Sequence, residues 1–237
     1  MSLFYVSDNY DNNNNVLYIR ENLSELFFKK GKMKIFADKH RAGLQMIVDD
    51  EYESVAKEEL FDKICDVITV GYKYNFFAQK IKLDGMKSEH KQLLLSSIIA
   101  ADFEDDKRYV KHRLSFVDKS IAIDGVYEFR LKNLKNKWLE IVNYIPDYFS
   151  ESELKSFIIY LTSEKKGKKV LIDGEKVYDR RFNRLKRVQL LPDGELKIVK
   201  EVLISGADEI ELKGKLPHED EIYLKEYFGD KICFTPY

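Results

Sequence analysis

The feature that most constrains the fold is a long central stretch that is almost free of proline. Between residues 51 and 165, Pro146 is the single proline, and turn-forming sequences are rare. Proline and clustered turn residues interrupt helices, so a stretch without them favours helical structure. Apolar residues recur in it at helical spacing, as at Leu60, Ile64 and Ile68. We therefore predict a helical middle region.

Two local patterns refine this prediction. After Asp124, which is a candidate N-cap, apolar residues recur in alternating steps of four and three and predict one amphipathic helix with a buried seam. The seam consists of Tyr127, Leu131, Leu134, Trp138, Ile141 and Ile145. Further on, Ser150 is followed three residues later by Glu153, the capping-box pattern, which predicts the start of a second helix.

The two ends of the chain alternate between strand and helix patterns. Residues 1–50 predict a small β-α-β-β unit that ends in a hairpin, and residues 166–237 predict a β-α-β-α-β unit with a partly parallel sheet. The polar stretch at 162–169 is suited to the boundary between the last two parts. The predicted fold is thus mixed α+β and α/β, with an N-terminal α/β unit at 1–50, a helical region at 51–165 and a C-terminal α/β unit at 166–237.

Composition limits the functional classes. The net charge is −1, so attraction to nucleic acid or to an anionic membrane requires a local patch rather than overall charge. Cys65 and Cys233 provide no disulfide framework, and Cys65 lies on an apolar helix face, where it fills the core. We find no signal-peptide pattern and no apolar run long enough to span a bilayer. We expect a cytoplasmic protein without a transmembrane segment.

The sequence contains no recognisable catalytic pattern. The histidines are dispersed, and neither a Gly-x-Ser-x-Gly elbow nor a glycine-rich phosphate loop occurs. The acidic runs at 49–53 and 102–106 fit solvated helix starts or connections better than a metal site. We therefore assign no catalytic, cofactor-binding or metal-binding residues and expect no cofactor.

Charge is distributed unevenly in the last third of the chain. Residues 164–187 hold ten basic and four acidic side chains, whereas residues 193–230 hold five basic and eleven acidic ones. Aromatic residues lie among the basic ones, and guanidinium groups match phosphate, so this is the candidate polyanion-binding cluster. It consists of Arg180, Arg181, Arg184, Lys186 and Arg187. A solvated basic surface that pairs with the acidic segment is the structural alternative, and contact between opposite patches in an oligomer or in a complex with a partner is another.

One segment resembles a known family. Residues 111–142, and above all "DGVYEFRLK" at 124–132, are similar to the central segment of the YtxC-like family of sporulation proteins of endospore-forming Firmicutes, and "YFGDKICFTPY" at 227–237 is similar to its C-terminal strand. The residues that carry the pattern are Phe129, Arg130, Leu131 and Lys132. The resemblance implies a sporulation context and supplies no catalytic residues.

These observations favour a nonenzymatic protein-interaction or scaffold protein whose protein partner is unknown. The first alternative is a nucleic-acid-binding module that uses the basic cluster at 178–187. The second alternative is an enzyme whose site is assembled from scattered residues. Contact between opposite charges also makes a homo-oligomer a hypothesis to test.

Overall fold

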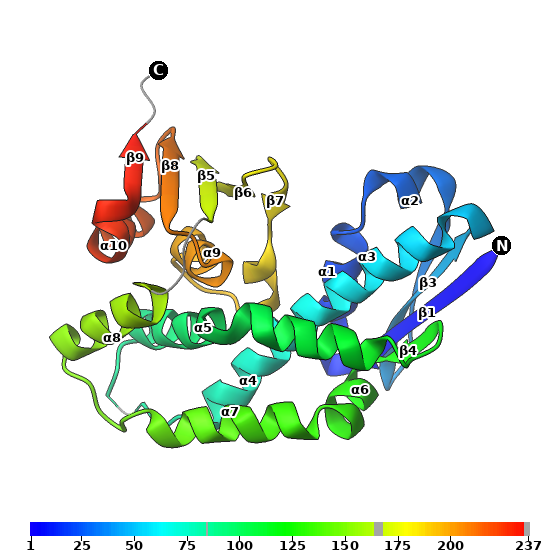
Figure 1. The fold of residues 1–237 in the computed structure, drawn as a ribbon, viewed down its shortest axis with the longest axis horizontal. Coiled ribbons are helices and arrows are strands. Elements are labelled where there is room, and N and C mark those ends of the chain that lie inside the picture. Colours follow the sequence, from blue (N-terminus) through cyan, green and yellow to red (C-terminus); the bar gives the residue numbers. More distant parts are fainter. Residues whose placement is uncertain (84, 164–167, 235–237) are drawn as a thin grey trace. The chain divides into compact units, whose positions relative to one another are not determined.

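The computed structural model describes residues 1–83, 85–163 and 168–234, which form two compact units (Figure 1). Unit 1 comprises Met1–Lys73 and Glu104–Ile141, and unit 2 comprises the described residues of Tyr74–Phe103 and Val142–Tyr237. The predicted mixed α+β fold with a helical middle is confirmed. The division into two units differs in kind from the sequence-based ranges 1–50, 51–165 and 166–237, because each unit joins two separate segments of the chain.

Unit 1 is built on a four-stranded sheet with the order β2-β3-β1-β4. Strand β3 pairs in antiparallel fashion with β2 on one side and with β1 on the other, and β4 pairs in parallel with β1. The bounds are β1 (Ser2–Asn9), β2 (Lys32–Ala37), β3 (Arg41–Val48) and β4 (Ser120–Ala122). The hairpin predicted in residues 33–48 is therefore confirmed.

The sheet of unit 1 is stabilised by side chains that are buried at alternate positions of a strand and by one close contact between an aromatic ring and a glycine. On β1, Phe4 and Val6 are buried and face the core, as expected for residues two apart on a strand. Phe36 lies opposite Gly43, and its ring occupies the space that a Cβ atom at Gly43 would need. The same ring stacks on Tyr5, with centroids 5.0 Å apart. A glycine is thus required at position 43 by the close approach of the aromatic ring.

The helices of unit 1 are shorter than the sequence predicts. The one helix predicted in the β-α-β-β unit at 1–50 is two helices. The predicted single helix after Asp124 is also two, because the chain leaves the helical conformation at Leu131. Ala122, not Asp124, is the N-cap residue of the first of these. Strand β4 lies in a range that was predicted to be entirely helical. The bounds are α1 (Asn13–Glu21), α2 (Glu25–Lys30), α3 (Glu53–Asp66), a π-helical turn (Val67–Tyr72), α6 (Ile123–Arg130) and α7 (Lys132–Tyr144).

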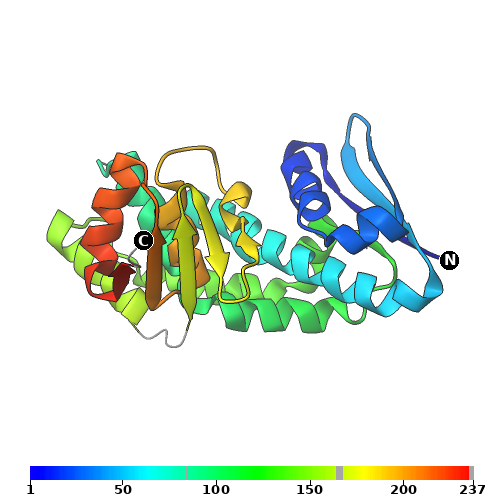
Figure 2. The same cartoon turned by 90° about the horizontal axis from the view of Figure 1, so that it is seen from above.

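Unit 2 is built on a five-stranded sheet with the order β7-β6-β5-β8-β9 (Figure 2). The strands β5, β8 and β9 are parallel, whereas β5, β6 and β7 form an antiparallel meander. The predicted partly parallel sheet is confirmed. The bounds are β5 (Lys169–Asp173), β6 (Lys176–Asp179), β7 (Arg184–Leu185), β8 (Glu209–Lys213) and β9 (Ile232–Phe234).

Helices cover the sheet of unit 2 and connect its parallel strands. The bounds are α4 (Lys73–Lys80), α5 (Ser88–Leu114), α8 (Glu151–Ser163), α9 (Lys197–Ser205) and α10 (His218–Phe228). Helix α5 belongs to unit 2 up to Phe103 and to unit 1 from Glu104. Helix α9 is buried along its whole length except at Lys197, and it packs against β6 and α10.

The two edges of this sheet differ in what lies beside them. The β6–β7 hairpin stands at one edge, and β9 with α10 stands at the other (Figures 1 and 2). Helix α8 packs against α10, where Lys155 pairs with Glu226 at 3.5 Å. The side chain of Lys231, just before β9, donates a hydrogen bond to the carbonyl of Thr162 at the end of α8. Helix α8 therefore belongs to the β9 side of unit 2.

Two predicted features are only partly described. Residues 164–167 of the linker predicted at 162–169 and the last three residues of the terminal strand predicted within 227–237 lie outside the described residues. Strand β9 confirms the part of that strand that is described.

Candidate interaction surface

The structure divides the predicted basic cluster into two groups. Arg180, Arg181 and Arg184 are exposed on or beside the turn that joins β6 to β7. Lys186 and Arg187 are half-buried after the hairpin, where the guanidinium of Arg187 lies 4.6 Å from the centre of the Phe103 ring. The first group can reach a partner, and the second is partly used for internal packing.

The hairpin turn is held in shape by Asp179. Its carboxylate accepts the backbone N–H groups of Arg181 and Asn183, each at 2.8 Å, and the backbone N–H of Phe182 donates to the Asp179 carbonyl. Phe182 adopts a φ of +60°, a left-handed conformation that is costly for a residue with a Cβ atom. Its ring is 74% exposed. The turn thus presents an aromatic side chain to solvent on an ordered backbone.

The arginines of the turn are not neutralised by the protein. Within the described part of the chain, no ion pair or side-chain hydrogen bond involves the guanidinium of Arg180, Arg181 or Arg184. The acidic segment at 193–230 therefore does not pair with these three side chains. The alternative in which the basic cluster pairs with that segment does not hold for them. Their positive charge remains directed at solvent.

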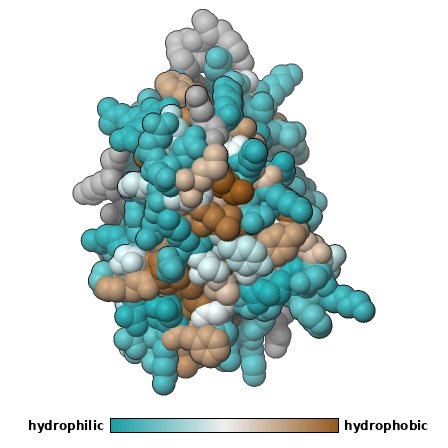
Figure 3. Space-filling model, turned by 90° about the vertical axis from the view of Figure 1, so that its right-hand side faces the viewer, coloured by the Kyte–Doolittle hydropathy of each residue, from teal (hydrophilic) through white to brown (hydrophobic). Residues whose placement is uncertain are grey.

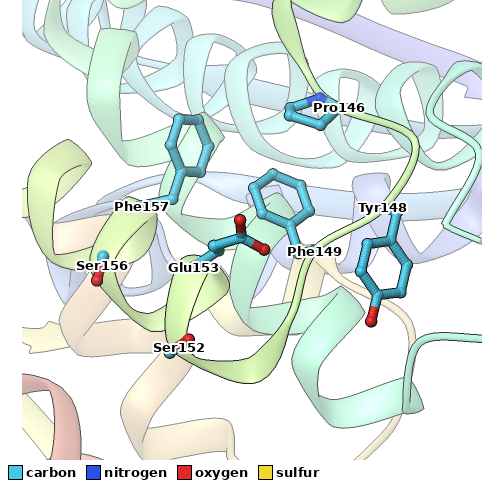
Figure 4. Close-up of a pocket in the computed structure, with 7 residues that line it drawn as sticks. All are labelled: Pro146, Tyr148, Phe149, Ser152, Glu153, Ser156 and Phe157. Atoms are coloured by element: carbon cyan, nitrogen blue, oxygen red, sulfur yellow. The ribbon is translucent and has the colours of Figure 1, made fainter.

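A second surface, which the sequence analysis did not identify, is an aromatic groove in unit 2. It has a volume of about 590 Å³ and lies between the α7–α8 connection and the first turns of α8 (Figure 4). We use the name aromatic groove for the site lined by Pro146, Tyr148, Phe149, Ser152, Glu153, Ser156 and Phe157. The rings of Phe149 and Phe157 contact each other, with centroids 5.5 Å apart, and Tyr148 is 75% exposed. The site is shallow and open to solvent, so it presents an exposed aromatic surface instead of an enclosed pocket.

The sequence builds this groove by ending one helix and starting another. Helix α7 ends at Tyr144, two residues before Pro146. The predicted capping box then starts α8: the Glu153 N–H donates to the Ser150 hydroxyl at 3.3 Å, and the Glu153 carboxylate accepts the Ser150 N–H at 2.9 Å. Because Ser150 donates hydrogen bonds to that carboxylate, the pKa of Glu153 is lowered. The capping box is confirmed, and it fixes one wall of the groove.

The segment that lines the groove is mainly acidic. Residues 146–157 contain Asp147, Glu151 and Glu153 and one basic residue, Lys155, which pairs with Glu226 on α10. Lys87 approaches Glu151 at 3.4 Å, but both side chains are mostly exposed, so this pair contributes little. The groove therefore combines exposed aromatic rings with a local negative charge.

A second cavity of unit 2 has several charged residues in its lining. It has a volume of about 400 Å³ and lies at the N-terminal ends of α9 and α10. The Asp220 carboxylate accepts the backbone N–H groups of Ile198 and Val199 at 3.0 Å, and burial raises its pKa. A hydrogen bond with Glu219 raises the pKa of Glu195. Asp220 is committed to capping α9, and no serine, threonine or cysteine lines this cavity.

Unit 1 contains a cluster of polar residues at the ends of β1 and β4. The buried Asp8 carboxylate accepts hydrogen bonds from Tyr72 at 2.6 Å and Asn15 at 2.8 Å, and burial raises its pKa. Arg41 forms two hydrogen bonds with Asp124, at 2.7 and 3.1 Å. Because these groups satisfy one another, the cluster serves to join the strands to α1 and α6. Asp8 lies near the end of β1 and Asp124 follows β4, and these two strands pair in parallel, which only the fold reveals.

The residues that carry the family resemblance lie at the junction of α6 and α7. Phe129 is 86% exposed, whereas Leu131 is fully buried at the break between the helices. Arg130 and Lys132 are exposed, and the Arg130 carbonyl accepts a hydrogen bond from Arg113. These residues do not gather around a cavity or a polar cluster.

The other exposed hydrophobic residues of unit 1 are distributed over several elements. They include Leu3 on β1, Leu17 on α1, Phe28 on α2 and Val55 on α3. Figure 3 shows a face that is mostly hydrophilic, with hydrophobic residues interspersed. Isolated exposed hydrophobic side chains are normal on protein surfaces. The aromatic groove and the β6–β7 hairpin are therefore the two stronger interaction candidates.

Comparison with known proteins adds no further assignment. No protein-family model, no curated protein and no solved structure matches this chain. In residues 1–83, 85–163 and 168–234, none of the helices has both the length and the apolar character needed to cross a membrane. Within the same ranges, no group of three or more His, Cys, Asp and Glu side chains is placed to hold a metal ion.

Proposed function

We propose that this protein is a nonenzymatic interaction protein whose aromatic groove binds a segment with an apolar anchor flanked by basic residues. The observation that carries the proposal is the open groove, in which Tyr148, Phe149 and Phe157 supply apolar surface beside the carboxylate of Glu153. Aromatic residues are enriched in binding surfaces because they bury a large area at a low cost in side-chain entropy. The acidic surroundings favour a basic partner and increase the rate of its approach.

We also propose a biological setting for this role. The similarity of residues 111–142 to the YtxC-like sporulation proteins supports the proposal that the interaction occurs in the cytoplasm of a sporulating bacterium. The resemblance and the groove are independent: the first supports the setting, and the second supports the mode of binding.

A peptide selection tests this function directly. Display of random twelve-residue peptides against the protein should enrich sequences with an aromatic or aliphatic residue between arginines or lysines. The Tyr148→Ala variant should lose about tenfold or more in affinity for these peptides, because it removes an exposed ring of the groove. Tyr160→Ala is the matched control, since Tyr160 is also exposed on α8 but does not line the groove. Enrichment of acidic peptides, or equal loss in both variants, would contradict the proposal.

Nucleic-acid binding through the β6–β7 hairpin is a second candidate function. The specific observation is the exposed Phe182 ring among three unneutralised guanidinium groups, since rings stack on bases and guanidinium groups bind phosphate. Affinity for single-stranded DNA or RNA should then fall steeply with salt, and joint Arg180→Ala and Arg184→Ala replacement should lower the salt slope. An unchanged slope would reject this site.

A further inference from the structure

The two surfaces of unit 2 are complementary in chemistry. The β6–β7 hairpin exposes the ring of Phe182 together with the side chains of Arg181 and Arg184, and the aromatic groove presents rings beside the carboxylate of Glu153. Guanidinium groups bind both carboxylates and aromatic faces, so each feature of the hairpin has a counterpart in the groove. We propose that the occupant of the aromatic groove is the β6–β7 hairpin of a second copy of this chain. This inference rests on the proposed function, because it uses the same groove.

The accessibility and rigidity of the two surfaces support this pairing. The aromatic groove is open to solvent, so a protruding turn has access to its rings. The hairpin turn is ordered before binding by the Asp179 hydrogen bonds to Arg181 and Asn183, so little backbone entropy is lost on docking. Positive φ at Phe182 projects the ring from the turn in the free protein.

The fold of unit 2 directs this contact to another molecule. The hairpin forms the β7 edge of the sheet, whereas the groove is on α8, which packs on α10 at the β9 edge (Figure 1). Four interstrand spacings separate the outermost strands, a distance of about 19 Å. A hairpin therefore cannot reach the groove of its own unit 2 without disrupting the sheet.

The resulting contact joins two different surfaces. A hairpin that docks into the groove of a second copy leaves one groove and one hairpin unoccupied. Such head-to-tail contacts close into a ring or continue into an open chain of molecules. Self-association should therefore increase with concentration beyond a dimer unless a ring closes.

Two variants, each defective in one surface, test the pairing. The hairpin variant carries Arg181→Glu and Phe182→Asn, and asparagine is chosen because it tolerates the left-handed conformation. The groove variant carries Asp147→Lys and Tyr148→Ala, at two exposed positions. In sedimentation velocity, the unchanged protein should associate with rising concentration, and association should weaken at high salt. Each variant alone should remain monomeric over a concentration range at least about tenfold higher, because it lacks one of the two surfaces.

An equimolar mixture of the two variants is the decisive sample. The hairpin variant keeps its groove, and the groove variant keeps its hairpin, so the mixture should form a one-to-one dimer that does not grow further. A mixture that stays monomeric, an unchanged protein that is monomeric at all concentrations, or variants that associate like the unchanged protein would each overturn the inference. Association that disappears after nuclease treatment would also overturn it, in favour of nucleic-acid bridging.

Control measurements separate this inference from the proposed function. Tyr160→Ala lies outside both surfaces, and Lys176→Glu lies at the end of β6 away from the β6–β7 turn. Both change exposed side chains and should associate like the unchanged protein. Circular dichroism should show that all variants are folded. If the groove binds the selected basic peptides but the variant mixture forms no dimer, the inference fails and the proposed function stands. If neither peptides nor a second copy bind, both fail.

Discussion

Lys200 is the residue whose burial couples the stability of unit 2 to pH. It lies on α9 with 1% of its surface exposed, and its amino group donates a hydrogen bond to Gln92 at 2.7 Å. Burial lowers its pKa to about 8, from an ordinary value of 10.5. At neutral pH the folded protein therefore holds a buried positive charge, which opposes folding.

We predict that Lys200→Met changes the dependence of stability on pH. Between pH 8 and 10.5 the unfolded chain binds more protons at this position than the folded chain, so raising the pH favours the folded state. From pH 8 to 10, the free energy of unfolding of the unchanged protein should rise by about 2 kcal/mol relative to the variant. Urea denaturation at several pH values measures this difference. Lys197→Met, on the exposed side of α9, controls for the loss of one charge, and a constant difference for Lys200→Met would contradict the prediction.

Asp106 shows why some important residues are invisible in the sequence. Its buried carboxylate accepts hydrogen bonds from the Lys73 ammonium group at 2.6 Å and the Trp138 indole N–H at 2.8 Å. The acidic run at 102–106 fits a solvated helix start in sequence, but Asp106 lies inside α5 and is fully buried. Its partners come from segments more than thirty positions away along the chain. No local pattern could have identified this pairing.

At the scale of elements, the start of α8 shows how a short sequence pattern can determine where a helix begins. Ser150 and Glu153 form the predicted capping box, because both hydrogen bonds join residues three positions apart. By contrast, β4 has three residues and exists by pairing with β1, more than a hundred positions earlier. The break between α6 and α7 is also hidden, since its apolar seam continues through Leu131 without a proline or glycine. The sequence thus predicts structure where the interactions are short in range.

We predict that Ser150→Ala destabilises the protein and loosens the aromatic groove. The change removes the hydroxyl that accepts the Glu153 N–H and donates to its carboxylate, and loss of an N-cap serine costs about 1 kcal/mol. Ser156→Ala, at an exposed position inside α8, removes a similar hydroxyl without a capping role and should change stability by less than about 0.5 kcal/mol. Urea denaturation measures both effects. Equal stabilities of the two variants would contradict the capping role of Ser150.

At the scale of the whole molecule, the two units are each discontinuous in sequence. Unit 2 joins Tyr74–Phe103 to the described part of Val142–Tyr237, and residues 104–141 between them belong to unit 1. Composition and turn signals mark changes along the chain, so they cannot show that distant segments share a core. The basic cluster illustrates the same limit, because Arg187 packs on Phe103 from the other segment of unit 2. Prediction from the sequence identified this charge but not its division between surface and interior.

Because unit 2 is built from two separate segments of the chain, it leads to a prediction about fragments of the protein. The segment 74–103 contributes fully buried Leu94 and Leu95, and its Gln92 binds Lys200 of the second segment. A fragment of residues 142–237 lacks this contribution, so its apolar residues would be exposed to water instead of being buried in a core. We expect it to unfold without a cooperative transition and to bind a hydrophobic dye. A chain in which a glycine-rich linker joins 74–103 to 142–237 should regain cooperative unfolding, as measured by near-ultraviolet circular dichroism with heating. Cooperative unfolding of 142–237 alone would show that the first segment is dispensable, because a core that forms without it does not depend on those buried leucines.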